Sequence, residues 1–227
     1  FENLGLEKKR KIMNKNGEMA DVDFSTPFTR VDFVELIKKD TDLDIREYSS
    51  ADQLRNDLVA KNIQIKDMEN MGLTTLVDSL YKKVSRPNLI NPTIVYNYPD
   101  FMQPLARRND DNPELVDQFQ LVINGWEILK AYSELVDPVD QKQRFSEQAK
   151  AKEAGDEEAM AGDDEYIVAM EHGMPPMSGW GMGIDRILAL LTKQPNLRDV
   201  VLFPLMRPKN SNELDEEAQE GDLEEDK

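Results

Sequence analysis

The run from Gly179 to Arg186 combines alternate glycines with an arginine, and its spacing indicates ligand chemistry more clearly than any other segment. Alternate glycines suit a strand whose backbone comes close to a flat ligand. Arg186 falls in the first turn of the helix expected next, and its planar guanidinium could stack on a base or hold a phosphate. The alternative is that Gly181 and Gly183 only allow tight packing while Asp185 pairs with Arg186. The segment is neither a dinucleotide fingerprint nor a GxxxxGK phosphate loop.

A second candidate site consists of two carboxylates, Glu127 and Glu134, seven residues apart and close to a segment that carries Gln120. Carboxylates that project from a sheet could hold Mg²⁺ against the phosphates of ATP, because Mg²⁺ prefers hard oxygen ligands. A carboxylate in a pocket could instead pair with a cationic substrate. The alternative, which is the commoner fate of a glutamate, is an exposed position bonded to Lys130 or Arg108.

Composition narrows the remaining chemistry. The sequence has no cysteine and a single histidine, His172, so disulfides, thiolate zinc sites and cysteine nucleophiles are excluded. His172 lies at an expected helix end, where it has no assigned catalytic role. The adjacent Arg107 and Arg108 could contact a phosphate or a nucleic acid, but ion pairs with nearby acidic side chains explain them equally well.

Charge and hydrophobicity suggest the setting of the protein. The formal net charge is -17, and a large share of it lies in residues 210–227, which we expect to form a disordered acidic tail. The remainder is mildly acidic, which argues against a nonspecific nucleic-acid binder. The sequence contains neither a membrane-spanning apolar run nor a secretory signal, and we therefore expect a cytoplasmic protein without a membrane partner.

Hydrophobic spacing in residues 1–90 predicts helices. Apolar residues recur at helical intervals from Thr29 to Lys39, and Ser50 is a good N-cap for a helix that stops before Asn62. A third helix is expected from Leu73 to Val84, followed by the breaker Pro87. We therefore expect residues 1–90 to form a helical portion of the protein.

The pattern changes to that of strands at about residue 91. Thr93 to Tyr96 reads as a buried strand. In the next strand Phe119, Leu121 and Ile123 are expected to face inward and the glutamines outward. A third strand is expected from Glu127 to Leu135, after an irregularity at Gly125.

The C-terminal elements complete the expected fold. Helices are predicted from Pro138 to Lys152, from Tyr166 to Glu171 and from Ile184 to Thr192, and a final strand from Val200 to Phe203. The order of elements favours an α+β fold, in which helices flank an antiparallel β-sheet. We expect the sheet-containing core to cover residues 91–209.

These segments together resemble class II lysyl-tRNA synthetases. Gly179 to Arg186, continued by Leu197 to Pro204 and Met206 to Pro208, resembles the third signature motif and C-terminus of that family. Three further segments look like the same family: Pro104 to Asn109, Tyr132 to Leu135 and Ala154 to Met160. The resemblance runs from about residue 92 to 208, and residues 1–90 are compatible with the less distinctive segment that precedes it.

The resemblance implies part of a six- or seven-stranded antiparallel sheet with flanking helices, usually in a homodimer. It also implies ATP and Mg²⁺ as cofactors, with lysine and tRNA(Lys) as partners of the full-length enzyme. By position, Arg186 would be the catalytic arginine that contacts ATP beside Gly181 and Gly183. Glu127 would ligate Mg²⁺, and Glu134 would receive the ε-ammonium of the substrate.

The sequence departs from the family pattern at positions near the implied site. Gln120 replaces a second metal-binding glutamate and should bind metal less strongly. The usual Arg-Glu-Ile-Gly-Asn-Gly reads Trp126 to Ala131, which places Lys130 near the expected amino-acid pocket. The anticodon-binding barrel and the first two signature motifs do not occur in the sequence, so we expect the piece to be inactive alone. The missing strands would leave an open sheet edge, so we expect either poor solubility or a partner chain.

Two other functions are compatible with the residues. One is a ligase that attaches lysine to a protein, and the other is a non-catalytic module derived from a synthetase and kept for binding or dimerisation. Gln120 and Lys130 would then be signs of decay. Retained Arg186, Glu127 and Glu134 favour the enzyme.

Overall fold

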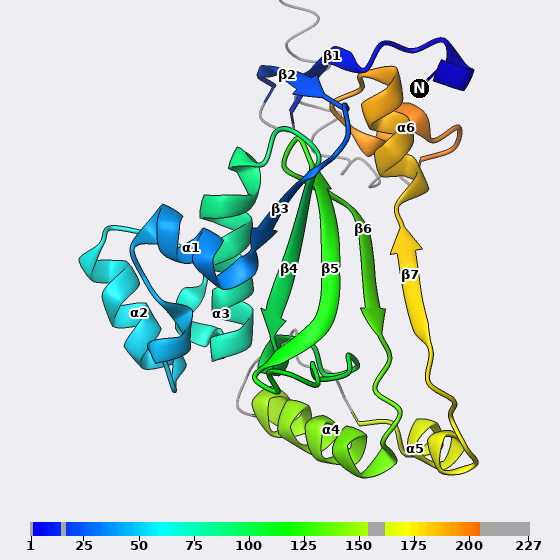
Figure 1. Cartoon of the computed structure of the whole chain (residues 1–227). Coiled ribbons are helices and arrows are strands. Elements are labelled where there is room, and N and C mark those ends of the chain that lie inside the picture. Colours follow the sequence, from blue (N-terminus) through cyan, green and yellow to red (C-terminus); the bar gives the residue numbers. More distant parts are fainter. Residues whose placement is uncertain (1, 15–16, 154–161, 205–227) are drawn as a thin grey trace, which may run out of the picture.

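The computed structural model describes residues 2–14, 17–153 and 162–204, in which a five-stranded sheet forms the centre (Figure 1). Its strands lie in the order β3 (Thr29–Asp32), β4 (Thr93–Pro99), β5 (Leu115–Ile123), β6 (Trp126–Ser133) and β7 (Ser178–Met182). β4 to β7 pair antiparallel, whereas β3 joins β4 in parallel. The predicted α+β class with helices around an antiparallel sheet is confirmed, with one parallel strand at its edge.

The start of the first predicted helix is wrong, because Thr29–Asp32 forms β3. β-branched Thr29 and Val31 fit a strand, and pairing with β4 satisfies their backbone. The helix α1 (Phe33–Thr41) begins only after Asp32, whose carboxylate accepts hydrogen bonds from the amides of Val34 and Glu35 at 2.9 and 3.1 Å. Tertiary pairing therefore overrides the helical spacing for four residues.

The other two helices of the N-terminal portion follow the prediction. α2 (Ala51–Ala60) is capped by the Ser50 side chain, and α3 (Leu73–Leu80) continues as a π turn (Tyr81–Ser85) and a 3₁₀ turn (Arg86–Asn88). α1 and α3 cover one face of the sheet, where the ring of Phe33 lies 4.9 Å from that of Tyr81 and 4.4 Å from that of Tyr98. We call this face of the sheet the front face.

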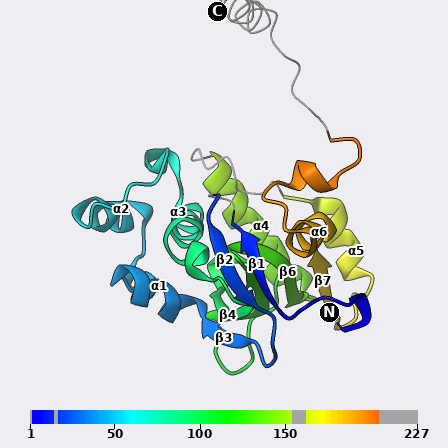
Figure 2. The same cartoon turned by 90° about the horizontal axis from the view of Figure 1, so that it is seen from above.

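A β-hairpin that the sequence did not indicate precedes these helices. It consists of β1 (Lys9–Met13) and β2 (Met19–Asp23), and it contributes Ile12 and Val22 to a second core. That core also contains Ile123, Ile128 and Leu190, so it joins the hairpin to the sheet and to α6 (Ile184–Thr192). In Figure 2, α1 to α3 gather at the β3–β4 side of the sheet and α6 lies at the β7 side.

The predicted orientation of β5 is wrong. Gln118 and Gln120 are buried, whereas Phe119 is 40% exposed. The reason lies in the neighbours of the glutamines, because Val116 and Val122 share their face and pack into the core beneath α1 and α3. Gln118 and Gln120 therefore lie on the front face, because Val116 and Val122 on either side of them are buried there.

The C-terminal helices match the prediction, but the final strand does not. α4 (Pro138–Glu153), α5 (Asp164–Glu171) and α6 are present. Instead of a strand from Val200 to Phe203, a 3₁₀ turn (Leu197–Val200) precedes irregular chain in which Leu202 and Phe203 are 91% and 90% exposed. The segment after α6 lies beyond the end of the five-stranded sheet (Figure 1), and within the described residues it pairs with no strand. The expected acidic tail and the segment from Ala154 to Met160 lie outside the described residues.

Candidate active site

The register of three strands places the predicted site residues in rows across the front face. Lys130 of β6 pairs with Gln120 of β5 on one side and with Gly181 of β7 on the other. Tyr132 similarly lies between Gln118 and Gly179. Because directly opposed residues share a face, all of these positions belong to the front face.

A bulge in β6 brings Glu127 onto the same face. In a regular strand Glu127 and Lys130 would point to opposite sides, since they are three residues apart. The register shifts between Leu121 and Val122, so that Glu127 pairs with Val122, which shares its face with Gln120. Ile128 turns instead to the opposite core. The bulge thus combines a carboxylate and an ammonium that sequence periodicity alone would separate.

Arg186 reaches this end of the front face from the first turn of α6. Its Nη1 donates to the main-chain oxygen of Glu127 and lies 4.0 Å from the carboxylate oxygen Oε1. A Cβ at Gly183 would stand only 3.1 Å from Cδ of Arg186, so the glycine leaves room for the arginine. Arg186 remains 44% exposed, which keeps the face of its guanidinium available to a ligand.

Lys130 lies in the middle of the front face and is half-buried. Its Nζ donates to Gln103 Oε1 at 2.7 Å and lies 5.7 Å from the centre of the Tyr132 ring. Burial lowers the pKa of Lys130 below its usual value, although the negative charges of Glu127 and Asp78 oppose that effect. Among the described residues, no carboxylate lies within ion-pair distance of this ammonium.

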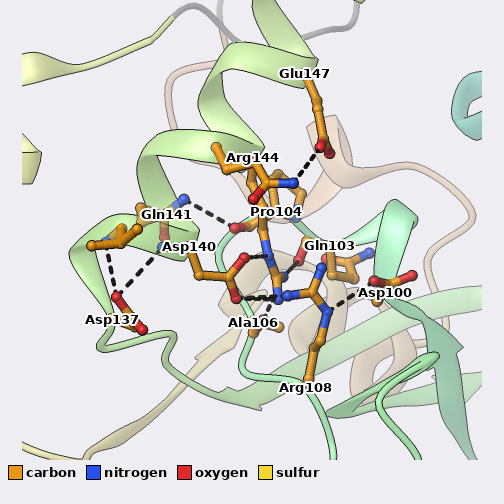
Figure 3. Close-up of polar contacts among 12 residues, drawn as sticks. Asp100, Gln103, Pro104, Ala106, Arg108, Asp137, Asp140, Gln141, Arg144 and Glu147 are labelled. Atoms are coloured by element: carbon orange, nitrogen blue, oxygen red, sulfur yellow. Dashed lines mark hydrogen bonds and ion pairs between the residues drawn. The ribbon is translucent and has the colours of Figure 1, made fainter.

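A network of partly buried polar contacts holds Gln103 in place (Figure 3). Arg144 of α4 is 4% exposed, and its Nη1 donates to the main-chain oxygens of Gln103 and Ala106 at 3.2 and 2.8 Å. Arg144 and Arg108 both bond to Asp140, the latter at 2.7 Å. Burial raises the pKa of Asp140, but the two arginines outweigh it and keep that pKa below its usual value. The segment that carries Gln103, the hydrogen-bond partner of Lys130, is therefore fixed by α4.

Glu134 lies at the other end of the front face, just beyond β6. Its amide donates to Met177 O at 3.0 Å, and a Cβ at Gly179 would stand 3.1 Å from its Oε1. It borders a hollow of about 650 Å³ whose wall also contains Tyr132, Phe145, Tyr166 and the acidic residues 163–165. Burial raises the pKa of Glu134. An acidic hollow with aromatic walls suits an organic ammonium.

Gln118 and Gln120 contribute buried amides to the front face. They are 5% and 7% exposed, and both amide atoms of Gln118 and the Oε1 of Gln120 have no hydrogen-bond partner within the described chain. Such groups are costly unless a ligand, ion or water satisfies them. Sequence reasoning missed Gln118 and Gln103, since nothing in their neighbourhood distinguishes them from solvated glutamines.

The donor set allows a magnesium ion with few protein ligands. The described residues contain no group of three or more acidic or histidine side chains able to hold a metal. Glu127 supplies one carboxylate, and the unpartnered Gln120 Oε1 could add a neutral oxygen. Mg²⁺ commonly takes one or two carboxylates together with substrate phosphates and water, so this set fits that mode and would leave most of the coordination to phosphate and water.

Other predicted candidates have structural roles. Arg107 pairs with Asp110 and, at 3.7 Å, with Asp117, while Arg108 belongs to the network of Figure 3. Within the described chain both arginines are thus engaged in ion pairs, as the alternative interpretation had it. The imidazole of His172 lies 2.7 Å from Val168 O, one turn back in α5.

Arg186, Glu127 and Glu134, the retained residues that favour an enzyme, share the front face but do not meet at one point. Arg186 and Glu127 lie at one end, Lys130 in the middle and Glu134 at the other end. At about 3.3 Å per strand residue, the seven residues from Glu127 to Glu134 put their Cα atoms at most roughly 23 Å apart. A ligand that touches both must therefore be elongated.

A hollow of about 940 Å³ lies mainly on the opposite face of the sheet, although Gln118 and Tyr132 also line it, and its wall contains none of the side chains of Arg186, Glu127, Lys130 and Glu134. It is lined mainly by apolar groups, among them Tyr96, Phe119, Leu129 and Trp180.

Within the described part of the chain, no helix is both long and apolar enough to cross a membrane.

Comparison with known proteins identifies the class of protein to which this site belongs. The family described as tRNA synthetases class II (D, K and N) matches residues 2–207, and the chain belongs to this family. Its similarity is to lysine–tRNA ligases: 46% identity over 82% of the chain for that of Serratia proteamaculans and 42% over 86% for that of Aquifex aeolicus. The ligase of Hahella chejuensis is 42% identical over 91% of the chain. The chain spans 37%, 32% and 41% of the lengths of these three relatives.

Proposed function

We propose that the chain is part of a lysine–tRNA ligase, which joins lysine to AMP at the expense of ATP and then transfers the lysyl group to tRNA(Lys). The single observation that carries this proposal is the order of groups on the front face. Arg186 and Glu127 at one end suit a nucleoside triphosphate, and Glu134 in an acidic hollow at the other end suits the ε-ammonium of lysine.

Each side chain of the proposed site has a defined task. Arg186 would contact ATP, and Gly181 would let the nucleotide approach the strand, because a Cβ there would meet nothing within 4 Å. Glu127 would hold Mg²⁺, with Gln120 as a weaker ligand, and the ion would neutralise phosphate charge when bound. Glu134 would orient lysine so that its carboxylate points towards the nucleotide end. Lys130 would lie beside the bound amino acid.

The reaction proposed is the attack of a lysine carboxylate oxygen on the α-phosphorus of ATP. A bond forms between that oxygen and phosphorus, and the bond to the oxygen that bridges to the β-phosphorus breaks, which releases pyrophosphate. The front face would contribute mainly by positioning two anions against each other and by balancing their charge.

The partners and organisation of the whole protein belong to the same proposal. We propose a cytoplasmic homodimer whose remaining segments supply tRNA binding and further contacts to ATP. We also retain the division into residues 1–90, a catalytic core over residues 91–209 and an acidic tail over residues 210–227 as a prediction.

Amino-acid-dependent exchange of pyrophosphate into ATP tests the proposal on the full natural protein that contains these residues. Lysine should support exchange, and arginine and ornithine should support it much less. Glu134→Gln should raise the KM for lysine by at least tenfold, whereas Glu69→Gln, which changes an exposed glutamate that does not line this hollow, should change it little. Absence of exchange with every amino acid would reject the proposal.

Gln120 and Lys130 favour a second candidate, a non-catalytic module that no longer binds nucleotide. Titration of ATP with Mg²⁺ into the full protein separates the two. Binding that disappears in Arg186→Gln supports the enzyme, and absence of binding supports the module.

A further inference from the structure

Lys130 is a desolvated ammonium that the proposed lysine and magnesium sites do not use. Within the described chain its one hydrogen bond is to a neutral group, Gln103 Oε1 at 2.7 Å, and the nearby negative charge of Glu127 is felt at longer range. A half-buried cation without a carboxylate in contact is costly unless an anion arrives. The position of Lys130 therefore indicates where negative charge of a ligand is stabilised.

The surroundings of Lys130 point to the same conclusion independently. Gln120 pairs with Lys130 and Gln118 with the neighbouring Tyr132; both glutamines are more than nine-tenths buried and carry amide atoms without partners in the described structure. The Nε2 of Gln118 is a donor that could stabilise an anionic oxygen together with Lys130, whereas the Oε1 of Gln120 is an acceptor and suits the metal ion proposed above. On the other side of Lys130, Gly181 of β7 leaves the space next to its strand open, because a Cβ at Gly181 would meet nothing within 4 Å.

The place of Lys130 along β6 decides which anion this is. It stands three residues after Glu127 and four before Glu134, between the nucleotide end and the ammonium end of the front face. If lysine is held by Glu134 and ATP by Arg186, the carboxylate of lysine and the α-phosphate of ATP meet above the middle of the strand.

We propose that Lys130 is a catalytic residue whose ammonium stabilises the negative charge shared by the attacking carboxylate and the α-phosphate during adenylate formation. This inference rests on the proposed function. No proton is transferred in the step, because the ammonium acts only as a fixed charge while the bond to the carboxylate oxygen forms and pyrophosphate leaves with its electron pair. Gln103 and, through it, Arg144 are positioning residues that hold the ammonium in place (Figure 3).

Charge removal at Lys130 in the full natural protein tests the inference. Lys130→Gln should lower kcat for lysine-dependent pyrophosphate exchange by about 10²- to 10³-fold, with little change in the KM for lysine. Lys130→Arg, which keeps the charge, should retain most of the activity. Lys66→Gln, which removes a lysine that is 94% exposed, is the matched control and should behave as the wild type.

Binding measurements provide a readout that a purely structural role would not produce. Lys130→Gln should weaken binding of lysinol-adenylate, which carries the phosphate charge, by at least tenfold and leave the affinities for lysinol and adenosine unchanged. Equal loss for all three ligands, or kcat within about threefold of wild type, would overturn the inference while the exchange activity of the wild type left the proposed function intact. Absence of exchange in the wild type would instead remove the proposed function itself.

Discussion

The guanidinium of Arg186 donates to the main-chain oxygen of Glu127, 59 residues earlier in the sequence, and lies 4.0 Å from its carboxylate. This contact joins the first turn of α6 to the bulge of β6. It places a planar cation and a carboxylate at the same end of the front face, where the proposed function needs a group for the nucleotide and a group for its metal.

Arg186→Gln should raise the Kd for ATP by at least tenfold, because glutamine can neither stack as a cation nor balance phosphate charge. Isothermal titration of ATP with Mg²⁺ measures the change. Arg30→Gln is a suitable control, since Arg30 contacts the Tyr96 ring at 5.1 Å and lines the hollow on the opposite face. Equal affinities of the two variants would contradict the assignment of Arg186.

Gly181→Ala should leave the Tm of the free protein unchanged or slightly higher, since the new methyl group meets nothing within 4 Å and glycine costs conformational entropy. It should nevertheless weaken ATP binding, because the methyl group would occupy space next to the strand that the nucleotide needs. Differential scanning calorimetry and titration with ATP check the two parts. Unchanged ATP affinity would remove Gly181 from the site.

Arg144→Met should reduce the free energy of unfolding by about 3 kcal/mol, because a buried charge partner of Asp140 and the donor to two main-chain oxygens are lost together. Urea denaturation measures this. Arg107→Met removes a side chain that is 40% exposed and lies next to Arg108 in the chain. This substitution should reduce the free energy of unfolding by less than about 1 kcal/mol. A similar loss in both would mean that the network of Figure 3 contributes no more than a surface pair.

The affinity for lysine should fall as the pH is lowered through the raised pKa of Glu134, because only the ionised carboxylate attracts the substrate ammonium. Burial raises this pKa above its usual value of 4.5, so the loss should begin at a higher pH than for an exposed glutamate. Glu134→Gln should abolish that pH dependence of the KM for lysine.

The raised pKa of Glu134 also affects the stability of the fold, and here a higher pH is unfavourable, whereas it favours lysine binding. A carboxyl group whose pKa is higher in the folded than in the unfolded state binds protons more tightly when folded, so its ionisation destabilises the fold as the pH rises above the unfolded pKa. Glu134→Gln should therefore be no less stable than wild type at pH 7. A clearly lower midpoint in urea would show that the carboxylate makes stabilising contacts instead.

Local patterns were enough to place most of the helices and the central strands. The Ser50 cap, the apolar spacing of α3, and the strand residues at 93–96 and 118–123 lie where their chemistry predicts, because caps and periodicity act over a few residues. The glycine run before Arg186 likewise indicated a strand followed by a helix, as found in β7 and α6. Where a stretch depended on a distant partner, as with β3 or the expected strand at Val200, local pattern failed.

The residue types of the site could be read from the amino acids, whereas their arrangement was decided by long-range pairing. Glu127, Glu134, Lys130 and Arg186 stand out as residues able to bind phosphate, metal or an ammonium. That Glu127 and Lys130 share a face depends on a bulge set by the register against β5. That Gln118 and Gln120 are buried depends on α1 and α3 packing over their valine neighbours. Such contacts join residues far apart in the chain, and hydrogen-bond register and side-chain packing select them only when the whole sheet has formed.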